Sequence, residues 1–200
     1  AYAWALVTRD TATLFTELRR VEKGAASMLK DNGVTLAEYA EIVPALRALP
    51  GDTVLAFDPK RVNKTLADSI ACPTREQEDV TILMKAVKNP TEQAGIRESA
   101  VWDGVAMVKF LKWLEEADRS AETEYTAGVK LAEIRKTMPL CISTSFGTIA
   151  AYKDHGAMMH YSATPETAYT LDGNGMMVLD SGGQYLNGTT DITRTAWIGP

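Results

Sequence analysis

The chain has 200 residues, 46% of them hydrophobic, and a formal net charge of −5, which allows one large domain or two small ones with a packed core. The modest negative charge, without a basic cluster, argues against nucleic-acid binding, and no apolar run approaches the roughly 20 residues that span a membrane. The two cysteines, Cys72 and Cys141, match no metal or disulfide spacing, which indicates a reducing compartment such as the cytoplasm.

The first segment alternates predicted strands and helices, which is an α/β pattern. Local signals mark its helices: Asn32-Gly33 is a helix-ending pair, Thr35 to Glu38 reads as a capping box, and Pro44 should kink a helix or begin a new one. The predicted elements are strands at 2–8 and 12–15, a helix ending at 32–33, a helix over 35–49, a strand at 53–57 and a helix over 62–70.

A polar stretch, 71–78, breaks this pattern, and we expect a domain boundary between about 72 and 88. The second segment then begins with a strong helix start, because Asn89 is a good N-cap and is followed by Pro90 and, at the third helical position, Glu92. This helix should run to about residue 117, and a second should cover about 124–135. The expected apolar stripe of the first is Val101, Val105, Val108, Leu111 and Leu114.

Two aspartates flank a turn signal near the end of the chain. An apolar strand, 176–179, leads into Asp180, and a β-prone run, 192–198, follows Asp191. A straight hairpin around Asn187-Gly188 would put both carboxylates on one face but four residues apart along the ladder, about 13 Å at about 3.3 Å per residue. For both to serve one dinuclear metal site, the turn must move towards Tyr185-Leu186 or the strand must bulge at its glycines.

The string Asp180-Ser-Gly-Gly-Gln-Tyr-Leu-Asn-Gly-Thr-Thr-Asp-Ile-Thr-Arg-Thr195 resembles the metal-binding hairpin of aminopeptidase P, one of the pita-bread metallopeptidases. Shorter stretches carry the same resemblance. Residues 85–92 are similar to the entry helix of the catalytic domain, 145–149 to an SF-x-TI strand, 156–161 to a GA-x-x-HY strand, and 163–167 to a segment of the longer, three-domain subfamily. The likeness is dense over about 85–198 and looser before.

The resemblance implies an α/β (α+β) architecture: a partial creatinase-like amino-terminal domain over 1–84 and the start of a pita-bread catalytic domain over 85–200. It implies two divalent metal ions, manganese first, with zinc or cobalt as alternatives. Asp180 would bind one ion and Asp191 would bridge both, while Thr193 would orient a ligand from the same strand face. His160 would be the catalytic, substrate-contacting residue, whereas we expect His155 to lie in a loop.

The activity implied is release of the N-terminal residue from peptides with proline in second place. The family's remaining ligands, one His and two Glu, lie beyond the hairpin, so we expect this chain alone to lack a complete site. The missing carboxy-terminal half or a homodimer partner would supply them. Two alternatives stay open: a prolidase-like dipeptidase, which residues 163–167 disfavour, and a non-catalytic binding module that retains part of the fold.

Overall fold

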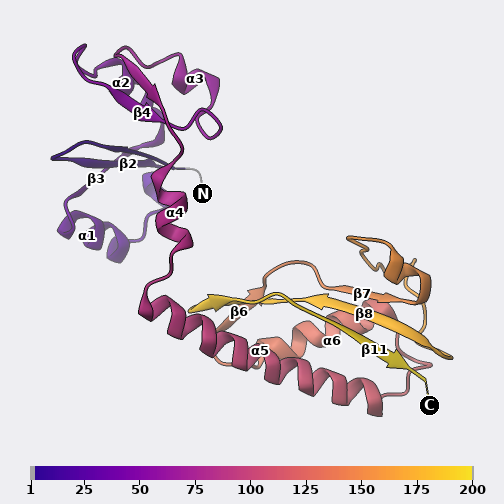
Figure 1. Cartoon of the computed structure of the whole chain (residues 1–200). Coiled ribbons are helices and arrows are strands. Elements are labelled where there is room, and N and C mark those ends of the chain that lie inside the picture. The colour runs from indigo at the N-terminus through magenta and orange to yellow at the C-terminus, as the bar shows by residue number, and fades with distance from the viewer. Residues whose placement is uncertain (1–2, 200) are drawn as a thin grey trace. The chain divides into compact units, whose positions relative to one another are not determined.

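The structure is a computed structural model that describes residues 3–199. The chain divides into two compact units, residues 1–86 and residues 87–200. Each unit combines helices with strands, which confirms the predicted mixed class (Figure 1). Tyr2, which the first predicted strand includes, lies outside the described residues.

The first unit is built from short elements around two small sheets. In one sheet the first two strands form an antiparallel hairpin and the third runs parallel to the second, while the other sheet is a parallel pair. The elements are β1 (Trp4–Val7), β2 (Ala12–Thr16), the 3₁₀ helix η1 (Leu18–Arg20), α1 (Lys23–Asp31), β3 (Val34–Glu38), η2 (Tyr39–Glu41), α2 (Ile42–Arg47), β4 (Leu55–Phe57), α3 (Lys64–Ala67), β5 (Thr74–Glu76) and α4 (Val80–Ala86).

Two predictions for this unit were wrong, both where strand pairing overrides a local signal. Thr35 to Glu38 is no capping box, because these residues pair with β2 as strand β3. The helix begins only at Ile42, with Pro44 in its first turn. Proline is tolerated there because backbone N–H groups in the first turn have no partner within the helix. The polar stretch 71–78 contains β5, whose backbone pairs with β4 although its side chains are exposed.

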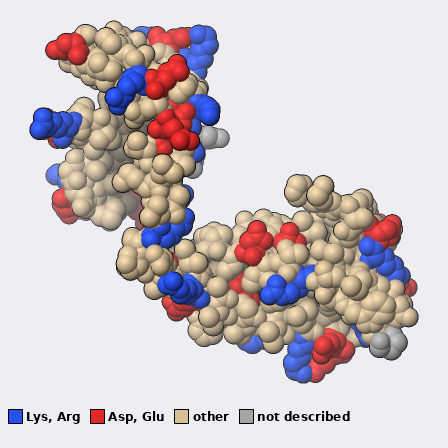
Figure 2. Space-filling model, in the orientation of Figure 1, with Lys and Arg blue, Asp and Glu red and all other residues tan. Residues whose placement is uncertain are grey.

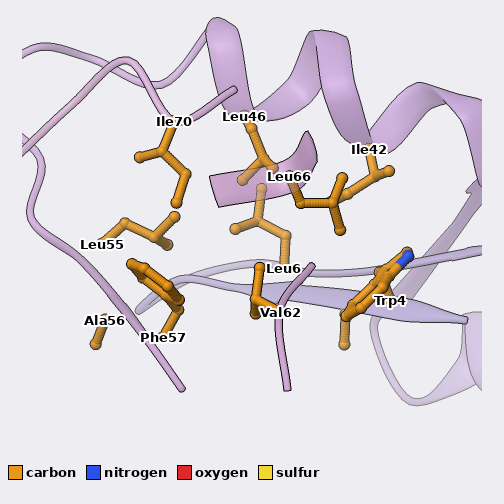
Figure 3. Close-up of a pocket in the computed structure, with 11 residues that line it drawn as sticks. Trp4, Leu6, Ile42, Leu46, Leu55, Ala56, Phe57, Val62, Leu66 and Ile70 are labelled. Carbon is orange, nitrogen blue, oxygen red and sulfur yellow. The ribbon is translucent and has the colours of Figure 1, made fainter. Parts of the chain in front are cut away.

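The core of the first unit gathers apolar side chains from the sheet and from the helices above it. Phe15, Ile42, Leu46 and Leu66 are buried there. A cavity of about 90 Å³ lies beside them, and Figure 3 shows the side chains that line it. All of its lining side chains are apolar, and such cavities stay dry. The cavity is therefore a packing feature, with no charged group to perform chemistry. It is lined by Trp4, Ala5, Leu6, Ile42, Leu46, Leu55, Ala56, Phe57, Val62, Leu66 and Ile70.

The second unit has two long helices followed by strands in two three-stranded sheets. The sheet orders are β10-β9-β6 and β11-β8-β7, and every pairing in both sheets is antiparallel. The elements are α5 (Pro90–Glu116), α6 (Glu124–Lys136), β6 (Cys141–Thr144), β7 (Ile149–Tyr152), the 3₁₀ helix η3 (Lys153–Ala157), β8 (Gly175–Ser181), β9 (Gly183–Tyr185), β10 (Gly188–Thr189) and β11 (Ile192–Ile198).

Helices α5 and α6 cover one face of the β11-β8-β7 sheet (Figure 1). Side chains from both helices and from all three strands form a single buried cluster, so the two helices fix the position of the sheet from one side. The buried members are Met107, Phe110, Leu114, Ala127, Leu131, Ala150, Tyr152, Leu171, Met177, Leu179 and Ile198.

Helix α5 starts as predicted, but its buried face is only partly the predicted one. Asn89 accepts from the backbone N–H of Glu92, and the Glu92 side chain accepts in return, which confirms the capping box. The expected stripe is right only in part: Leu114 is buried and Val105 and Leu111 pack against buried clusters, whereas Val101 and Val108 are 64% and 67% exposed. The buried face instead carries Ser99 and Asp103 beside its apolar members. The Ser99 hydroxyl donates to the Ile96 carbonyl within the same helix at 3.0 Å, whereas the partners of Asp103 are far away in the sequence and are described below.

The surface has no single-sign charge field on the face that Figure 2 displays, where acidic and basic side chains are interspersed. None of the helices within residues 3–199 combines the length and the apolar character that crossing a membrane requires. These findings agree with the charge pattern of the sequence.

Candidate metal centre

The register between β8 and β11 decides how the two aspartates meet. Asp180 pairs with Thr193, not with Thr195 as a straight hairpin around Asn187-Gly188 would require. The ladder of β9 and β10 has the same register, so Asp191 falls opposite Gly182. Asp180 and Asp191 are therefore diagonal neighbours on adjacent strands, a relation that places Cα atoms about 7–8 Å apart. The predicted displacement of the turn is confirmed.

The turn moved by one residue because α5 packs against the hairpin. Tyr185 pairs with Gly188, which leaves Leu186-Asn187 as the turn, and neither has a positive φ. Gly188 lies against Ser99 of α5, and a Cβ at Gly95 would come within 2.5 Å of the Asn187 carbonyl oxygen. The glycine of the Asn-Gly pair therefore serves close packing on a helix rather than a positive-φ turn.

A break in the ladder separates the two sheets beside the aspartates. Gly182 and Thr190 lie at the break, and Ser145 fills it from a third segment. The Ser145 N–H donates to the Gly182 carbonyl at 3.1 Å, and its Oγ donates to the Thr190 carbonyl at 2.9 Å. Ser145 is thus not in a strand, contrary to prediction, because strand β7 begins only at Ile149.

Gly182 cannot carry a side chain, since a Cβ there would overlap the Thr190 carbonyl and the Ser145 hydroxyl. We expect Gly182→Ala to destabilise the fold by about 1–3 kcal/mol, because backbone must move to make room. Urea unfolding measures the change. The matched control is Gly147→Ala, where an added Cβ meets nothing within 4 Å. Equal stabilities for the two variants would contradict this account of the break.

Both carboxylates lie on the face of the sheet opposite the helices. Leu179 and Ser181 are buried, whereas Asp180 is half-buried and Asp191 and Thr193 are exposed. The Thr193 Oγ1 donates to Asp180 Oδ1 at 2.9 Å, which fixes one carboxylate oxygen, and no other side chain among residues 3–199 donates to the second one. Two nearby carboxylates on an accessible face are ligands that suit hard divalent cations. The donor set therefore fits a metal site, although its use as one stays a prediction.

His160 lies in a turn, not in the predicted strand over 156–161. Residues 153–157 form the 3₁₀ helix η3, and His160 follows it with φ of 60°, in the left-handed region. Its side chain is exposed. In residues 3–199 no hydrogen bond joins His160 to Asp180 or Asp191, whereas Thr193 is bonded to Asp180.

His155 was expected in a loop, but it lies in the 3₁₀ helix η3 with its ring in a polar cluster. Its Nδ1 lies 2.9 Å and 3.0 Å from the two carboxylate oxygens of Glu124, which is fully buried. Burial and the hydrogen bond to Glu124 raise the pKa of Tyr161 to about 12. Sequence reasoning missed this cluster because its members are 31 and 37 residues apart.

A second buried network lies directly behind Asp180. Arg135, 1% exposed, donates to both oxygens of Asp103 at 2.7 Å and 3.2 Å and to the Ser181 hydroxyl at 3.0 Å. The Tyr185 hydroxyl also donates to Asp103, at 3.0 Å. Burial, followed by the charge of Asp103, raises the pKa of Tyr185, so it stays a donor. The network ties α5 and α6 to the residues on both sides of Gly182.

Two carboxylates do not make a complete site. Among the residues that the structure describes, no group of three or more His, Cys, Asp or Glu side chains is close enough to hold a metal ion. Any ion at Asp180 and Asp191 therefore takes its other ligands from water, from substrate or from outside this set.

Comparison with known proteins identifies relatives of the chain. Over its full length the chain matches Xaa-Pro aminopeptidase 1 of Dictyostelium discoideum, with 31% identity over 203 residues that are 98% of this chain and 32% of the relative. Aminopeptidase P1 of Arabidopsis thaliana is 29% identical, over 99% of this chain and 38% of the relative. The chain thus spans about a third of the length of these curated relatives.

Solved structures show the same fold. The X-prolyl aminopeptidase of Caenorhabditis elegans, described as a cytosolic enzyme with a di-nuclear active site, superposes with a TM-score of 0.87 and 27% identity. The match covers all of this chain and 34% of the Caenorhabditis enzyme. The Xaa-Pro dipeptidase of Bacillus anthracis, at 20% identity, has a TM-score of 0.78 over all of this chain and 56% of its own.

Family models divide the sequence between two known domains. Residues 1–92 match the creatinase/prolidase N-terminal domain, and residues 94–200 match metallopeptidase family M24. The second match covers more than half of the chain and contains the two aspartates, Thr193 and His160. These findings confirm the resemblance that the sequence motifs suggested, and the chain belongs to metallopeptidase family M24.

Proposed function

We propose that this chain contributes to a metal-dependent aminopeptidase that releases the N-terminal residue from peptides with proline in second place. The observation that carries the proposal is the shared register of the hairpin, which sets Asp180 and Asp191 diagonally on one accessible face. The names of the relatives in Dictyostelium and Arabidopsis support the reaction, and that of the Caenorhabditis enzyme supports a dinuclear site.

In this proposal residues 1–84 are part of a creatinase-like domain and residues 85–200 begin the catalytic domain. The cofactor is a pair of divalent ions, manganese first, since carboxylates suit hard cations; zinc and cobalt are the alternatives. Asp180 would hold one ion and Asp191 would bridge both. The remaining ligands would come from polypeptide outside the described residues, in the same protein or in a second copy. The cytosolic description of the Caenorhabditis enzyme supports a cytoplasmic location.

When bound, such a pair of ions supplies an activated water and polarises the scissile carbonyl. The chain's own residues position the rest. Thr193 holds Asp180 Oδ1 by a hydrogen bond, so Oδ2 would be the oxygen offered to an ion. His160, exposed on its turn, would contact the substrate. The Xaa-Pro bond is a tertiary amide without N–H, so recognition must rely on such side chains and on ring shape rather than on that amide.

The test compares peptides that differ only in length and in the second residue. A protein that carries this chain together with the missing ligands is loaded with manganese and given an Xaa-Pro-Xaa tripeptide, an Xaa-Pro dipeptide and an Xaa-Ala-Xaa tripeptide. We expect turnover of the Xaa-Pro tripeptide above the other two. Preference for the dipeptide would establish a prolidase-like activity instead, and turnover of none would favour the non-catalytic module.

A further inference from the structure

The buried carboxylate of Glu124 joins three separate segments of the second unit. Glu124 is 0% exposed and is the first residue of α6, where the helix N-terminus favours negative charge. It accepts from the backbone N–H groups of Tyr152 at 2.6 Å and Tyr169 at 2.8 Å, and from the Tyr161 hydroxyl at 2.8 Å. His155 supplies the remaining donor. A carboxylate only accepts, so the His155 tautomer that matches this arrangement is the one with its proton on Nδ1.

The imidazole of His155 is also held on both ring faces. Tyr161 stacks at a centroid distance of 4.4 Å with an interplanar angle of 29°, and Tyr169 at 3.7 Å and 14°. The His155 side chain is only 12% exposed. Removing this ring would therefore take a donor from Glu124 and a stacking partner from Tyr161 at the same time.

The turn that follows carries His160 in a conformation that the backbone does not favour by itself. A left-handed φ of 60° is uncommon for a residue other than glycine, and it persists only where the surroundings enforce it. The restraints here are local: the Met158 N–H donates to the His155 carbonyl at 3.0 Å, and the Tyr161 N–H donates to the Met158 carbonyl at 3.2 Å. Tyr161 is in turn anchored on Glu124.

We propose that His155 is a positioning residue that, through Glu124 and Tyr161, fixes the 158–161 turn and so holds His160 where the substrate meets it. His155 does not itself touch the substrate. The inference rests on the proposed function for the role of His160, but the restraint of the turn is a property of the chain alone.

The chain contains only two histidines, so ring-labelled NMR reads both directly. In the wild type we expect one sharp His160 ring signal, identified by its loss in His160→Gln. In His155→Ala that signal should shift or split, because the turn relaxes. His155→Asn should restore the wild-type signal in large part, since the amide nitrogen takes the place of Nδ1 as donor to Glu124. Neither the shift in His155→Ala nor its reversal in His155→Asn would follow if His155 merely filled space.

Two tyrosine variants keep the test decisive if His155→Ala does not fold. Tyr161→Phe removes only the hydroxyl bond to Glu124 and should perturb the His160 signal. The matched control, Tyr152→Phe, loses one hydroxyl bond of similar length, 2.7 Å to the Asp172 carbonyl. It should leave the His160 signal unchanged. An unperturbed His160 signal in Tyr161→Phe would overturn the proposal.

Activity separates this inference from the proposed function. In the metal-loaded enzyme, His155→Ala should lower kcat/KM for an Xaa-Pro peptide by about 10- to 100-fold with metal content unchanged, and His155→Asn should recover most of it. If the wild type turns over no Xaa-Pro peptide but the His160 signal responds as expected, the proposed function fails and the positioning role stands. A normal rate in His155→Ala would overturn the positioning role alone.

Discussion

Asp191→Asn is expected to abolish Xaa-Pro cleavage in the metal-loaded enzyme while the fold survives. The loss should be at least about 10²-fold, because even partners that only orient metal ligands are worth 10–100-fold. The substitution removes a charge that two ions would share. Asp191 is exposed, and surface substitutions usually change stability by about ±0.5 kcal/mol or less. Turnover with added manganese measures the loss of cleavage, and the melting temperature shows whether the fold survives.

Glu115→Gln serves as the matched control for Asp191→Asn. It also turns an exposed carboxylate of the second unit into an amide, but on α5 and away from the hairpin. The control should keep wild-type turnover and metal content. Wild-type rates in Asp191→Asn, or equal losses in both variants, would refute the bridging role of Asp191.

Arg135→Met is expected to destabilise the second unit by about 3–5 kcal/mol. The Asp103 carboxylate is 0% exposed, and without Arg135 it would remain buried with only the Tyr185 hydroxyl as donor. Breaking a buried pair from one side costs this much because a charge is left uncompensated. Ser181, next to Asp180, loses a partner too. Urea unfolding of the chain, followed by tryptophan fluorescence, measures the change.

Two further variants test the reason for that loss. Lys130→Met removes a positive charge from the same helix, but from a loose ion pair of 3.9 Å with Glu133 on the surface, and should barely move the unfolding midpoint. Asp103→Leu combined with Arg135→Met should recover part of the stability, because a buried pair replaced on both sides leaves no orphan charge. A double variant less stable than Arg135→Met would contradict the argument.

The parts of the fold that local sequence could predict are those where local and tertiary preferences agree. The capping box at Asn89 forms because both of its members are within one helical turn. Thr35 to Glu38 has an equally good local signal, yet it pairs with β2, since a hairpin with an unpaired edge offers more backbone bonds than a cap does. Helix periodicity predicted only part of the buried face of α5, which includes Leu114 as expected. Val101 and Val108 have helical spacing but are exposed. Asp103 is buried in the same helix, because Arg135 neutralises its charge.

The candidate site divides in the same way. Strand parity and the distance that a metal site allows were enough to predict that the turn must move or a strand must bulge, and the register shows that the turn moved. The reason for the shift, the contact of Gly188 with α5, involves a helix nearly ninety residues earlier and left no local signal. The partnership of His155 with Glu124 was invisible for the same reason, since each residue alone has an ordinary surface sequence context.

The central claim is that the hairpin brings Asp180 and Asp191 together as metal ligands, and manganese broadening of amide NMR signals tests it most directly. The ¹⁵N-labelled chain is titrated with manganese, whose paramagnetism broadens nearby amides. We expect broadening centred on residues 180, 191 and 193, and its loss in the Asp180→Asn, Asp191→Asn double variant. Broadening centred on another acidic stretch, or unchanged in the double variant, would contradict the claim.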